Sequence, residues 1–416
     1  MHLIYRNTCR VCGNTDLRPA FSLGDHYLHG SFVNPSKNIY PPTRKIPVDL
    51  VRCNPCQNNG CGLLQLKHTV DPSILYAAYG YRSSTSKTMR DWLSYVVDSV
   101  IKIKPNVESV QDIGANDLFT LKQFPQNIKR VGVDGCDIIG KVDNEGIKVI
   151  NGLYPHAVTK TDNYDVILSL ACLYDIELVN DFVSAISQQL NTDGLWVFEV
   201  AYLPTILKRV DYSHYVNEHL ETYSLSVLER LLKDHGLKIF KCELSETNGG
   251  SILCYACHKS YNSYSNPEDL NNIQKIRLLE FDMMLDTDIP YVEFRDKMDE
   301  HGRDLLQLVS KIVLEGKTAH LYSASTKGNV VLQKAGIDSR LVKYASERSV
   351  EKVGCKTLGT NIEIISEEDS RKMKPDYYLC LIPAFKKEIL EREKEMIDQG
   401  AKFIFPFPYP ISVVPK

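Results

Sequence analysis

The chain has 416 residues, of which 43% are hydrophobic and 24% charged, with 23 glycines and 19 prolines. This is the composition of an ordinary globular protein of about two or three domains, and it excludes disordered and collagen-like chains. Forty-nine Lys and Arg against 52 Asp and Glu give a formal charge of -3, so no bulk positive field favours nucleic acid as a partner.

No apolar run approaches the ~20 residues of a membrane span, and the N-terminus reaches Cys9 without the apolar region of a signal peptide. We therefore expect a cytoplasmic protein with no membrane partner. Its thiols are expected to be reduced, because disulfides are rare in that compartment.

Five of the twelve cysteines lie in the first 61 residues. The first two form a C-x-x-C pair, and the others follow about forty residues later. Two such groups of thiolates are the usual ligand set of a structural, tetrahedral zinc ion. The predicted ligands are Cys9, Cys12, Cys53 and Cys61. Cys56 remains open as an alternative fourth ligand, and the competing interpretation is a set of unrelated thiols.

The central part of the chain reads as an α/β domain. Helical spacing over residues 71–105 precedes a β-α-β unit with the strands SVQDIG and KRVGVDG, and the pattern repeats through YDVILSLACLY, DFVSAISQQL and GLWVFEVAY. This alternation predicts a doubly wound parallel sheet. A helix that stops at Gly236 and two late antiparallel strands complete the domain. In the strand SILCYACHK, Cys254 and Cys257 are expected to face opposite sides, which disfavours a second metal site.

Residues 258–315 are polar and helix-rich and are expected to connect the central domain to a second, smaller α/β unit. That unit contains the strand and helix of TAHLYSASTKGNVVLQKAG and ends in the strand AKFIFPF. The predicted organisation is a zinc-binding domain over 1–70, a Rossmann-like domain over 71–260 and a C-terminal α/β domain over 261–416.

A nucleoside-binding corner is predicted where the first two central strands end. Gly114 would let a ligand approach the backbone, and Asp134, twenty residues later, could bind ribose hydroxyls. No G-x-G-x-x-G is present, so a single nucleoside such as S-adenosylmethionine is favoured over a dinucleotide. By itself the pattern is common in α/β folds.

Several runs, taken in order, resemble one family, the S-adenosylmethionine-dependent C-methyltransferases that act on nucleotide-linked deoxy-keto-sugars. The runs are CRVCG, CGLLQLKHTV, YGYRSSTSKTMRDWL, DIGAND, NEHLETYSL, NGGS, SASTKGNVVLQKAGI and the FIFPFP end. The resemblance covers nearly the whole chain. It implies a class I methyltransferase domain, S-adenosylmethionine as cofactor, structural zinc, a nucleotide-sugar substrate and a role in deoxysugar or polysaccharide biosynthesis.

The resemblance also implies the reaction, in which a base removes the proton at sugar C3, beside a C4 ketone, and the enolate carbon accepts a methyl group. His219 is the candidate base, and Glu218 either orients its imidazole or binds a sugar hydroxyl. Tyr81 resembles the family tyrosine near donor and substrate. The implied donor-binding residues are Gly114, Asn116, Asp117 and Asp134. The simpler interpretations are a capping or surface Glu-His pair and a core tyrosine.

A second candidate site lies where a strand of the C-terminal unit turns into a helix. Free amides and a nearby ammonium at such a turn suit a diphosphate. The candidate substrate-binding residues are Ser325, Thr326, Lys327 and Asn329. An ordinary capped helix start with an exposed lysine is the alternative.

The chain departs from the family at several candidate positions. Leu118 replaces a usual glycine, and a β-carbon there is expected to oppose a positive φ and the approach of the donor. Asn217 and Asn248 replace frequent histidines, so titratable groups are lost. Besides methyl transfer, the sequence therefore admits a donor-independent epimerase or isomerase of a keto-sugar nucleotide, or a non-catalytic sugar-nucleotide binder.

Overall fold

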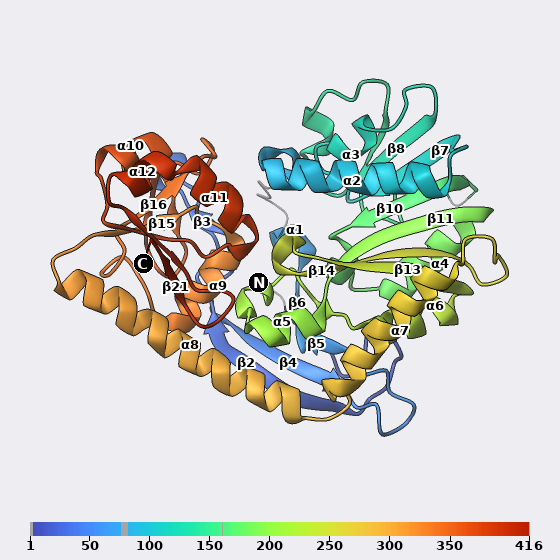
Figure 1. Ribbon diagram of the computed structural model, residues 1–416, viewed down its shortest axis with the longest axis horizontal. Coiled ribbons are helices and arrows are strands. Elements are labelled where there is room, and N and C mark those ends of the chain that lie inside the picture. The colour runs from blue at the N-terminus through green and yellow to red at the C-terminus, as the bar shows by residue number, and fades with distance from the viewer. Residues whose placement is uncertain (1–2, 76–81, 160, 416) are drawn as a thin grey trace.

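The computed structural model describes residues 3–75, 82–159 and 161–415 (Figure 1). Three sheets carry the fold, together with a short strand pair at the N-terminus. Among the described residues, no helix combines the length and apolar character needed to cross a bilayer.

The N-terminal segment is organised around a long antiparallel ribbon of β2 (Leu17–His26) and β4 (Ile46–Cys53). The short strands β5 (Leu64–Leu66) and β12 (Glu221–Thr222) extend it to four strands. The strands β1 (Leu3–Tyr5) and β6 (His68–Val70) pair beside it, and α1 (Pro72–Leu75) follows. In Figure 1 the ribbon runs through the lower part of the molecule, from below the central domain toward the C-terminal one.

The central domain is built on a seven-stranded sheet of order β13-β14-β11-β10-β7-β8-β9. Its strands are β7 (Ser109–Ile113), β8 (Lys129–Asp134), β9 (Lys148–Asn151), β10 (Tyr164–Leu170), β11 (Leu190–Ala201), β13 (Leu237–Ser245) and β14 (Ser251–His258). Its helices are α2 (Lys87–Ile103), α3 (Phe119–Lys122), α4 (Val179–Gln189), α5 (Leu203–Arg209) and α6 (Leu225–Asp234).

The five strands from β9 to β11 are parallel, and β14 is antiparallel to both of its neighbours. The predicted doubly wound sheet and its late antiparallel pair are confirmed. Cys254 and Cys257 belong to separate hydrophobic clusters, on the two faces of the sheet. The strand order reverses between β7 and β10, and the carboxyl ends of strands at such a point form the usual ligand crevice of an α/β sheet.

Helix α2 illustrates how the sequence specifies these elements. Ser86 caps it, since its Oγ accepts a hydrogen bond from the backbone N–H of Met89. Its buried residues recur every three or four positions. They are Met89, Leu93, Val96, Val97 and Val100. Together with sheet residues, Val96, Val97 and Val100 form the core on one face of the central domain.

Two helices, α7 (Pro267–Asp282) and α8 (Ile289–Leu314), make the predicted helical connection. The C-terminal sheet has the order β21-β20-β19-β15-β16-β18-β17-β3, with a parallel centre from β20 to β18. Its strands are β3 (Phe32–Val33), β15 (Ala319–Tyr322), β16 (Tyr344–Glu347), β17 (Lys356–Thr357), β18 (Glu363–Ser366), β19 (Tyr377–Leu379), β20 (Lys402–Phe405) and β21 (Ser412–Val414). Its helices are α9 (Thr326–Ala335), α10 (Glu367–Lys372), α11 (Lys386–Arg392) and α12 (Lys394–Asp398).

Strands cross the boundaries expected from the sequence. The N-terminal β3 forms an edge of the C-terminal sheet, and β12 of the central segment joins the N-terminal sheet. Each exchanged strand is two residues long. The three parts of the chain are therefore joined by backbone hydrogen bonds as well as by side-chain packing.

Candidate functional site

Four thiols meet at one end of the β2–β4 ribbon. The Sγ atoms of the cluster Cys9, Cys12, Cys53 and Cys61 lie within 4.8 Å of one another. Cys9 Sγ is 3.4 Å from Cys61 Sγ, and Cys12 Sγ is 3.5 Å from Cys53 Sγ. Cys56 is exposed and lies outside the cluster. The structure therefore places Cys61, and not Cys56, as the fourth thiol.

These dimensions fit zinc. A Zn–S bond of about 2.3 Å puts thiolates at tetrahedral corners about 3.8 Å apart, close to the two measured sulfur separations. The backbone N–H of Cys61 donates to Cys53 Sγ over 3.3 Å, and such a hydrogen bond favours the thiolate. Four protein ligands leave no open coordination position, so the ion would be structural.

The carboxyl ends of β7 and β8 form a polar corner. Gly114 follows β7 with a φ of +80°, and a Cβ on it would lie 3.1 Å from Cys172 Cβ. Asp134 Oδ2 accepts the backbone N–H of Asn116 over 2.8 Å, and its Oδ1 accepts that of Cys136 over 2.7 Å. Asp134 remains partly exposed. The structure thus brings together the glycine and the acid that the sequence singled out.

Asn116 and Asp117 shape this corner from the other side. Asn116 Oδ1 accepts the backbone N–H of Ser83 over 3.0 Å, and Asp117 Oδ2 accepts that of Ser84 over 3.0 Å. Both side chains therefore hold the segment that leads into α2. The predicted residue Tyr81 lies just before this segment, outside the described residues.

Leu118 corrects the expectation that a β-carbon prevents a left-handed backbone here. Its φ is +64°, and its side chain is fully buried in the core formed with α2. Leu118 Cδ2 lies 2.7 Å from the position that a Cβ on Gly132 would occupy. The Leu118 side chain packs against β8 at Gly132, where the missing side chain leaves room for it. The same strand carries Asp134 at its end, so Leu118 packs beside the polar corner.

His219 lies in the loop between α5 and β12, with most of its surface buried. Its Nδ1 is 2.7 Å from the backbone oxygen of His214, and because a carbonyl only accepts, Nδ1 carries the proton. Nε2 of the neutral ring therefore presents a lone pair. Burial, and then the charge of Lys327, lower the pKa of His219 to about 3, so the imidazole is neutral near pH 7.

Two aromatic rings surround His219. The Tyr174 ring centroid is 4.5 Å from that of His219, and the His214 ring centroid is 4.3 Å away. Tyr174 follows β10, two residues after the Cys172 that touches Gly114. The short loop after β10 therefore links the predicted base to the polar corner.

Glu218 lies where all three parts of the chain meet. A Cβ on Gly30 of the N-terminal segment would be 2.6 Å from Glu218 Oε1 and 3.7 Å from Oγ1 of Thr326, in α9. Glu218 Oε2 is buried and has no hydrogen-bond partner among the described residues. Burial raises the pKa of Glu218 to about 7. No hydrogen bond joins Glu218 to His219 in the described structure.

The predicted diphosphate-binding residues make mostly internal contacts. Ser325 Oγ accepts the backbone N–H of Gly328 over 2.9 Å and caps α9. Lys327 Nζ donates to the backbone oxygen of Asn248 over 2.6 Å, and Asn329 Nδ2 donates to that of His29 over 2.7 Å. Lys327 thus connects α9 to the NGGS loop, and Asn329 connects it to the N-terminal segment.

Sequence reasoning missed other polar residues around the junction, the place where Gly30, Glu218 and Thr326 meet. Glu199 lies two residues before the end of the buried strand β11 and accepts a 3.0 Å hydrogen bond from Trp92 Nε1. Burial raises its pKa to about 7. Burial lowers the pKa of Lys327, and the nearby carboxylates of Asp211 and Glu199 act in the opposite direction. A single acid inside the apolar run GLWVFEV was the available signal for Glu199. No local pattern marked His29.

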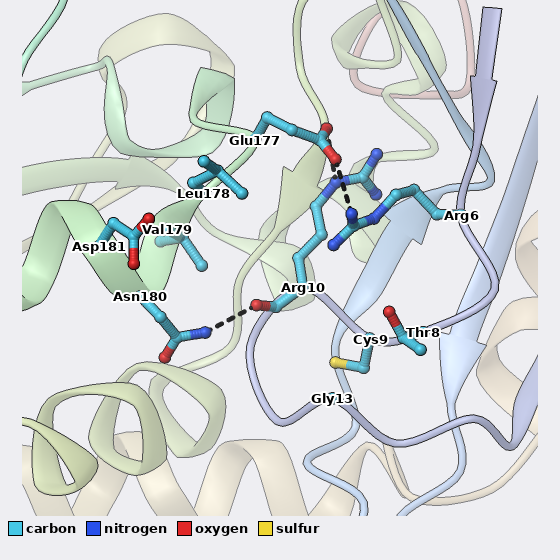
Figure 2. Close-up of a pocket in the computed structure, with 10 residues that line it drawn as sticks. All are labelled: Arg6, Thr8, Cys9, Arg10, Gly13, Glu177, Leu178, Val179, Asn180 and Asp181. Atoms are coloured by element: carbon cyan, nitrogen blue, oxygen red, sulfur yellow. Dashed lines mark hydrogen bonds and ion pairs between the residues drawn. The ribbon is translucent and has the colours of Figure 1, made fainter. Parts of the chain in front are cut away.

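A surface pocket of about 240 Å³ lies between the zinc-binding segment and α4 (Figure 2). Arg6 approaches Glu177 at 3.1 Å, and Arg10 approaches it at 3.2 Å. Asn180 Nδ2 donates to the backbone oxygen of Arg10 over 2.9 Å. These contacts fix the loop that carries Cys9 against the central domain, and the pocket shares no lining residue with the His219 and Glu218 junction.

Two domain families match the chain. Residues 9–76 match a zinc binding domain, and residues 246–408 match the C-methyltransferase C-terminal domain. The C-methyltransferase NovU of Streptomyces niveus is 28% identical over 411 residues, which cover 97% of this chain and 96% of that protein.

Solved structures resemble smaller parts of the chain. The PH0226 protein of Pyrococcus horikoshii is 16% identical with a TM-score of 0.37, covering 46% of this chain and 97% of that one. Magnesium protoporphyrin IX methyltransferase of Synechocystis, solved with S-adenosylhomocysteine, is 15% identical with a TM-score of 0.34. The match covers 44% of this chain and 91% of that one.

Both matched domains occur in the order and at the places that the fold shows, with the cysteine cluster inside the first of them. The full-length relative spans all three parts of the chain. Over nearly its whole length the chain is therefore similar to a C-methyltransferase, and it carries matches to both a zinc binding domain and the C-methyltransferase C-terminal domain.

Proposed function

We propose that this protein transfers a methyl group from S-adenosylmethionine to a carbon of a nucleotide-linked deoxy-keto-sugar, through an enolate, with His219 as the base. The observation that carries the proposal is the orientation of His219. Its Nδ1 proton is held by the His214 carbonyl, which leaves Nε2 to accept a proton.

The donor is assigned to the polar corner at the ends of β7 and β8. Gly114 has no side chain to obstruct a nucleoside, and Asp134 keeps acceptor capacity beyond the two backbone N–H groups that it binds. Leu118 leaves the corner free because its side chain is in the core. When bound, S-adenosylmethionine supplies a methyl group on a positively charged sulfur.

His219 removes the proton beside the ketone. A base is most effective when its pKa is near the operating pH, and in the ligand-free protein burial and Lys327 hold the pKa of His219 to about 3. The negative diphosphate of a sugar nucleotide would raise that pKa by favouring the imidazolium. Substrate binding therefore strengthens the base at the moment when it is needed.

Glu218 binds a sugar hydroxyl in this proposal. Of the two roles open to it, orientation of the imidazole is already performed by the His214 carbonyl. Its Oε2 is buried without a partner among the described residues, and a buried oxygen of this kind is costly unless a ligand or water hydrogen-bonds to it. A sugar hydroxyl satisfies that need.

The substrate reaches α9 on the opposite side of the junction. Thr326 Oγ1 lies near both Gly30 and Glu218, which suits a contact to the sugar nucleotide. Ser325, Lys327 and Asn329 bind protein groups in this structure, so their role toward a diphosphate stays a prediction. The reduced thiolates needed for zinc fit a cytoplasmic setting.

The test is methyl transfer itself. The protein is incubated with S-adenosylmethionine and a panel of 4-keto-deoxysugar nucleotides, and products are analysed by mass spectrometry and NMR. We expect one added methyl on the carbon beside the ketone, and its loss in His219→Asn with unchanged binding of S-adenosylhomocysteine. Methylation on oxygen, or full activity of His219→Asn, would contradict the proposal.

A further inference from the structure

We propose that Gly30, in the zinc-binding domain, is a positioning residue for Glu218: its missing side chain leaves the space that the Glu218 carboxylate occupies. The N-terminal segment thereby sets the place of a substrate-binding group that the central domain supplies. The role of Glu218 toward substrate rests on the proposed function, whereas its placement by Gly30 is a property of the folded protein.

The first support is the absence of a backbone reason for glycine at this position. Gly30 is not among the glycines with a left-handed φ, so an L-residue could adopt its conformation. Among the residues that the structure describes, one atom opposes a side chain at this position, Glu218 Oε1, which lies 2.6 Å from the Cβ position. The next atom, Oγ1 of Thr326, is at 3.7 Å, which is an ordinary contact.

The second support is the rigid attachment of the loop that carries Gly30. The backbone N–H of His29 donates to Asn217 Oδ1 over 3.1 Å, and the backbone oxygen of His29 accepts Asn329 Nδ2 over 2.7 Å. The loop is therefore fixed from the central domain and from α9 at the same residue. Asn217 directly precedes Glu218, and His29 directly precedes Gly30. The hydrogen bond between His29 and Asn217 therefore holds Gly30 and Glu218 next to each other.

A pair of histidines anchors the same loop to the ribbon. His26 Nδ1 is 2.9 Å from His29 Nε2, and both rings are buried. Burial lowers the pKa of each ring, and a neutral pair can form one hydrogen bond with one ring as donor. His26 is the last residue of β2, opposite Ile46, whereas Leu17 at the other end of β2 is opposite the zinc ligand Cys53.

The ribbon therefore carries the zinc cluster at one end and the Glu218 contact at the other. Ten residues of strand separate the two ends, about 30 Å at a rise of about 3.3 Å per residue. Figure 1 shows β2 and β4 passing beneath the central domain toward the C-terminal one. This placement gives the zinc-binding domain a direct part in the substrate site.

The test uses Gly30→Ala in the full-length, zinc-loaded protein. The added Cβ must displace the Glu218 carboxylate, which ends a flexible side chain, so the protein is expected to fold with its zinc content unchanged. Gly302→Ala, in α8, is the matched control, because a Cβ there meets no atom closer than 3.9 Å.

The first readout needs no substrate. The carboxyl carbon of Glu218 is followed by NMR, with its signal assigned by its loss in Glu218→Gln. We expect its titration midpoint to move by at least half a pH unit in Gly30→Ala and to stay in place in Gly302→Ala. An unchanged midpoint in Gly30→Ala would overturn the inference, whether or not the proposed function holds.

The second readout is kinetic. With a methyl-accepting sugar nucleotide, Gly30→Ala is expected to lower kcat/KM for that substrate at least tenfold and to leave KM for S-adenosylmethionine within twofold. Adding Glu218→Asp, whose side chain is shorter by one methylene, should raise kcat/KM at least threefold above that of Gly30→Ala alone. Loss of kcat/KM without this rescue contradicts steric positioning, and absence of any methyl transfer by the unaltered protein contradicts the proposed function instead.

Discussion

Replacing Leu118 by glycine, the residue usual in the family, is expected to destabilise this protein. The left-handed φ of +64° at Leu118 costs an L-residue roughly 1–2 kcal/mol, which glycine avoids. About 0.4–1 kcal/mol of that relief is offset, because glycine gives the unfolded chain more freedom. The side chain, however, is fully buried.

The packing loss is larger than this relief. Truncation of a buried leucine to alanine costs about 2.7–5 kcal/mol, depending on the cavity that remains. The difference gives Leu118→Gly a net loss of roughly 1–5 kcal/mol. Leu118→Ala, which loses the packing and keeps the strain, should be at least as unstable.

Urea unfolding followed by tryptophan fluorescence measures this effect in the relevant domain, because the two tryptophans of the chain, Trp92 and Trp196, both belong to the central domain. Calorimetry with S-adenosylhomocysteine should show affinity within about threefold of the parent protein for folded Leu118→Gly, a free-energy change below ~0.7 kcal/mol. A stability equal to or above that of the parent would refute the placement of Leu118 in the core. A large gain in affinity would show that the side chain obstructs the donor.

Three further predictions concern the cysteine cluster, the junction and the contact between domains. Cys61→Ser should abolish the one equivalent of zinc found by metal analysis, and Cys56→Ser should retain it, since only the former belongs to the cluster; equal zinc in both variants would argue against it. Burial raises the pKa of Glu218 from 4.5 to about 7, so the unfolded carboxyl ionises first and the parent protein loses stability as the pH rises between these values. Glu218→Gln lacks this loss, and its unfolding free energy relative to the parent should rise by about 3 kcal/mol from pH 4.5 to pH 7.5; a flat or falling difference in urea titrations would be inconsistent with a buried carboxyl. Arg10→Met should cost at least about 3 kcal/mol in the same urea assay, because it removes the buried guanidinium that donates to the backbone oxygen of Leu66, to Thr69 Oγ1 and to Glu177 Oε2; a loss below ~1 kcal/mol would show that these hydrogen bonds do not hold the domains together.

Local patterns were sufficient to predict the sheet and three of the four clustered thiols, whereas the choice of Cys61 over Cys56 required the structure. The spacing of Cys9 and Cys12 puts two thiols on one turn, and the alternation of helices and strands after residue 105 leaves few topologies other than a doubly wound sheet. The polar corner followed from the same logic. Gly114 and Asp134 end neighbouring parallel strands, so their positions along the sheet are set by strand register.

The junction could not be predicted because it depends on contacts between residues far apart in the sequence. Gly30, Glu218 and Thr326 come from three parts of the chain, and no periodicity relates them. The direction of Leu118 was equally hidden, because it depends on the space beside Gly132 in the next strand. Sequence reasoning left Lys327 as either a diphosphate ligand or an exposed lysine at a helix start, and it could not foresee that the ammonium donates to the backbone oxygen of Asn248.

Hydrogen exchange at the substrate carbon tests the central claim, that the imidazole of His219 removes a proton beside a ketone. The protein is saturated with S-adenosylhomocysteine, so that no methyl group is transferred, and the keto-sugar nucleotide is followed by NMR in deuterium oxide. We expect deuterium to enter at the carbon beside the ketone with the parent protein and not with His219→Asn, at equal occupancy by S-adenosylhomocysteine. Exchange at the same rate in both proteins, or in neither, would contradict the account.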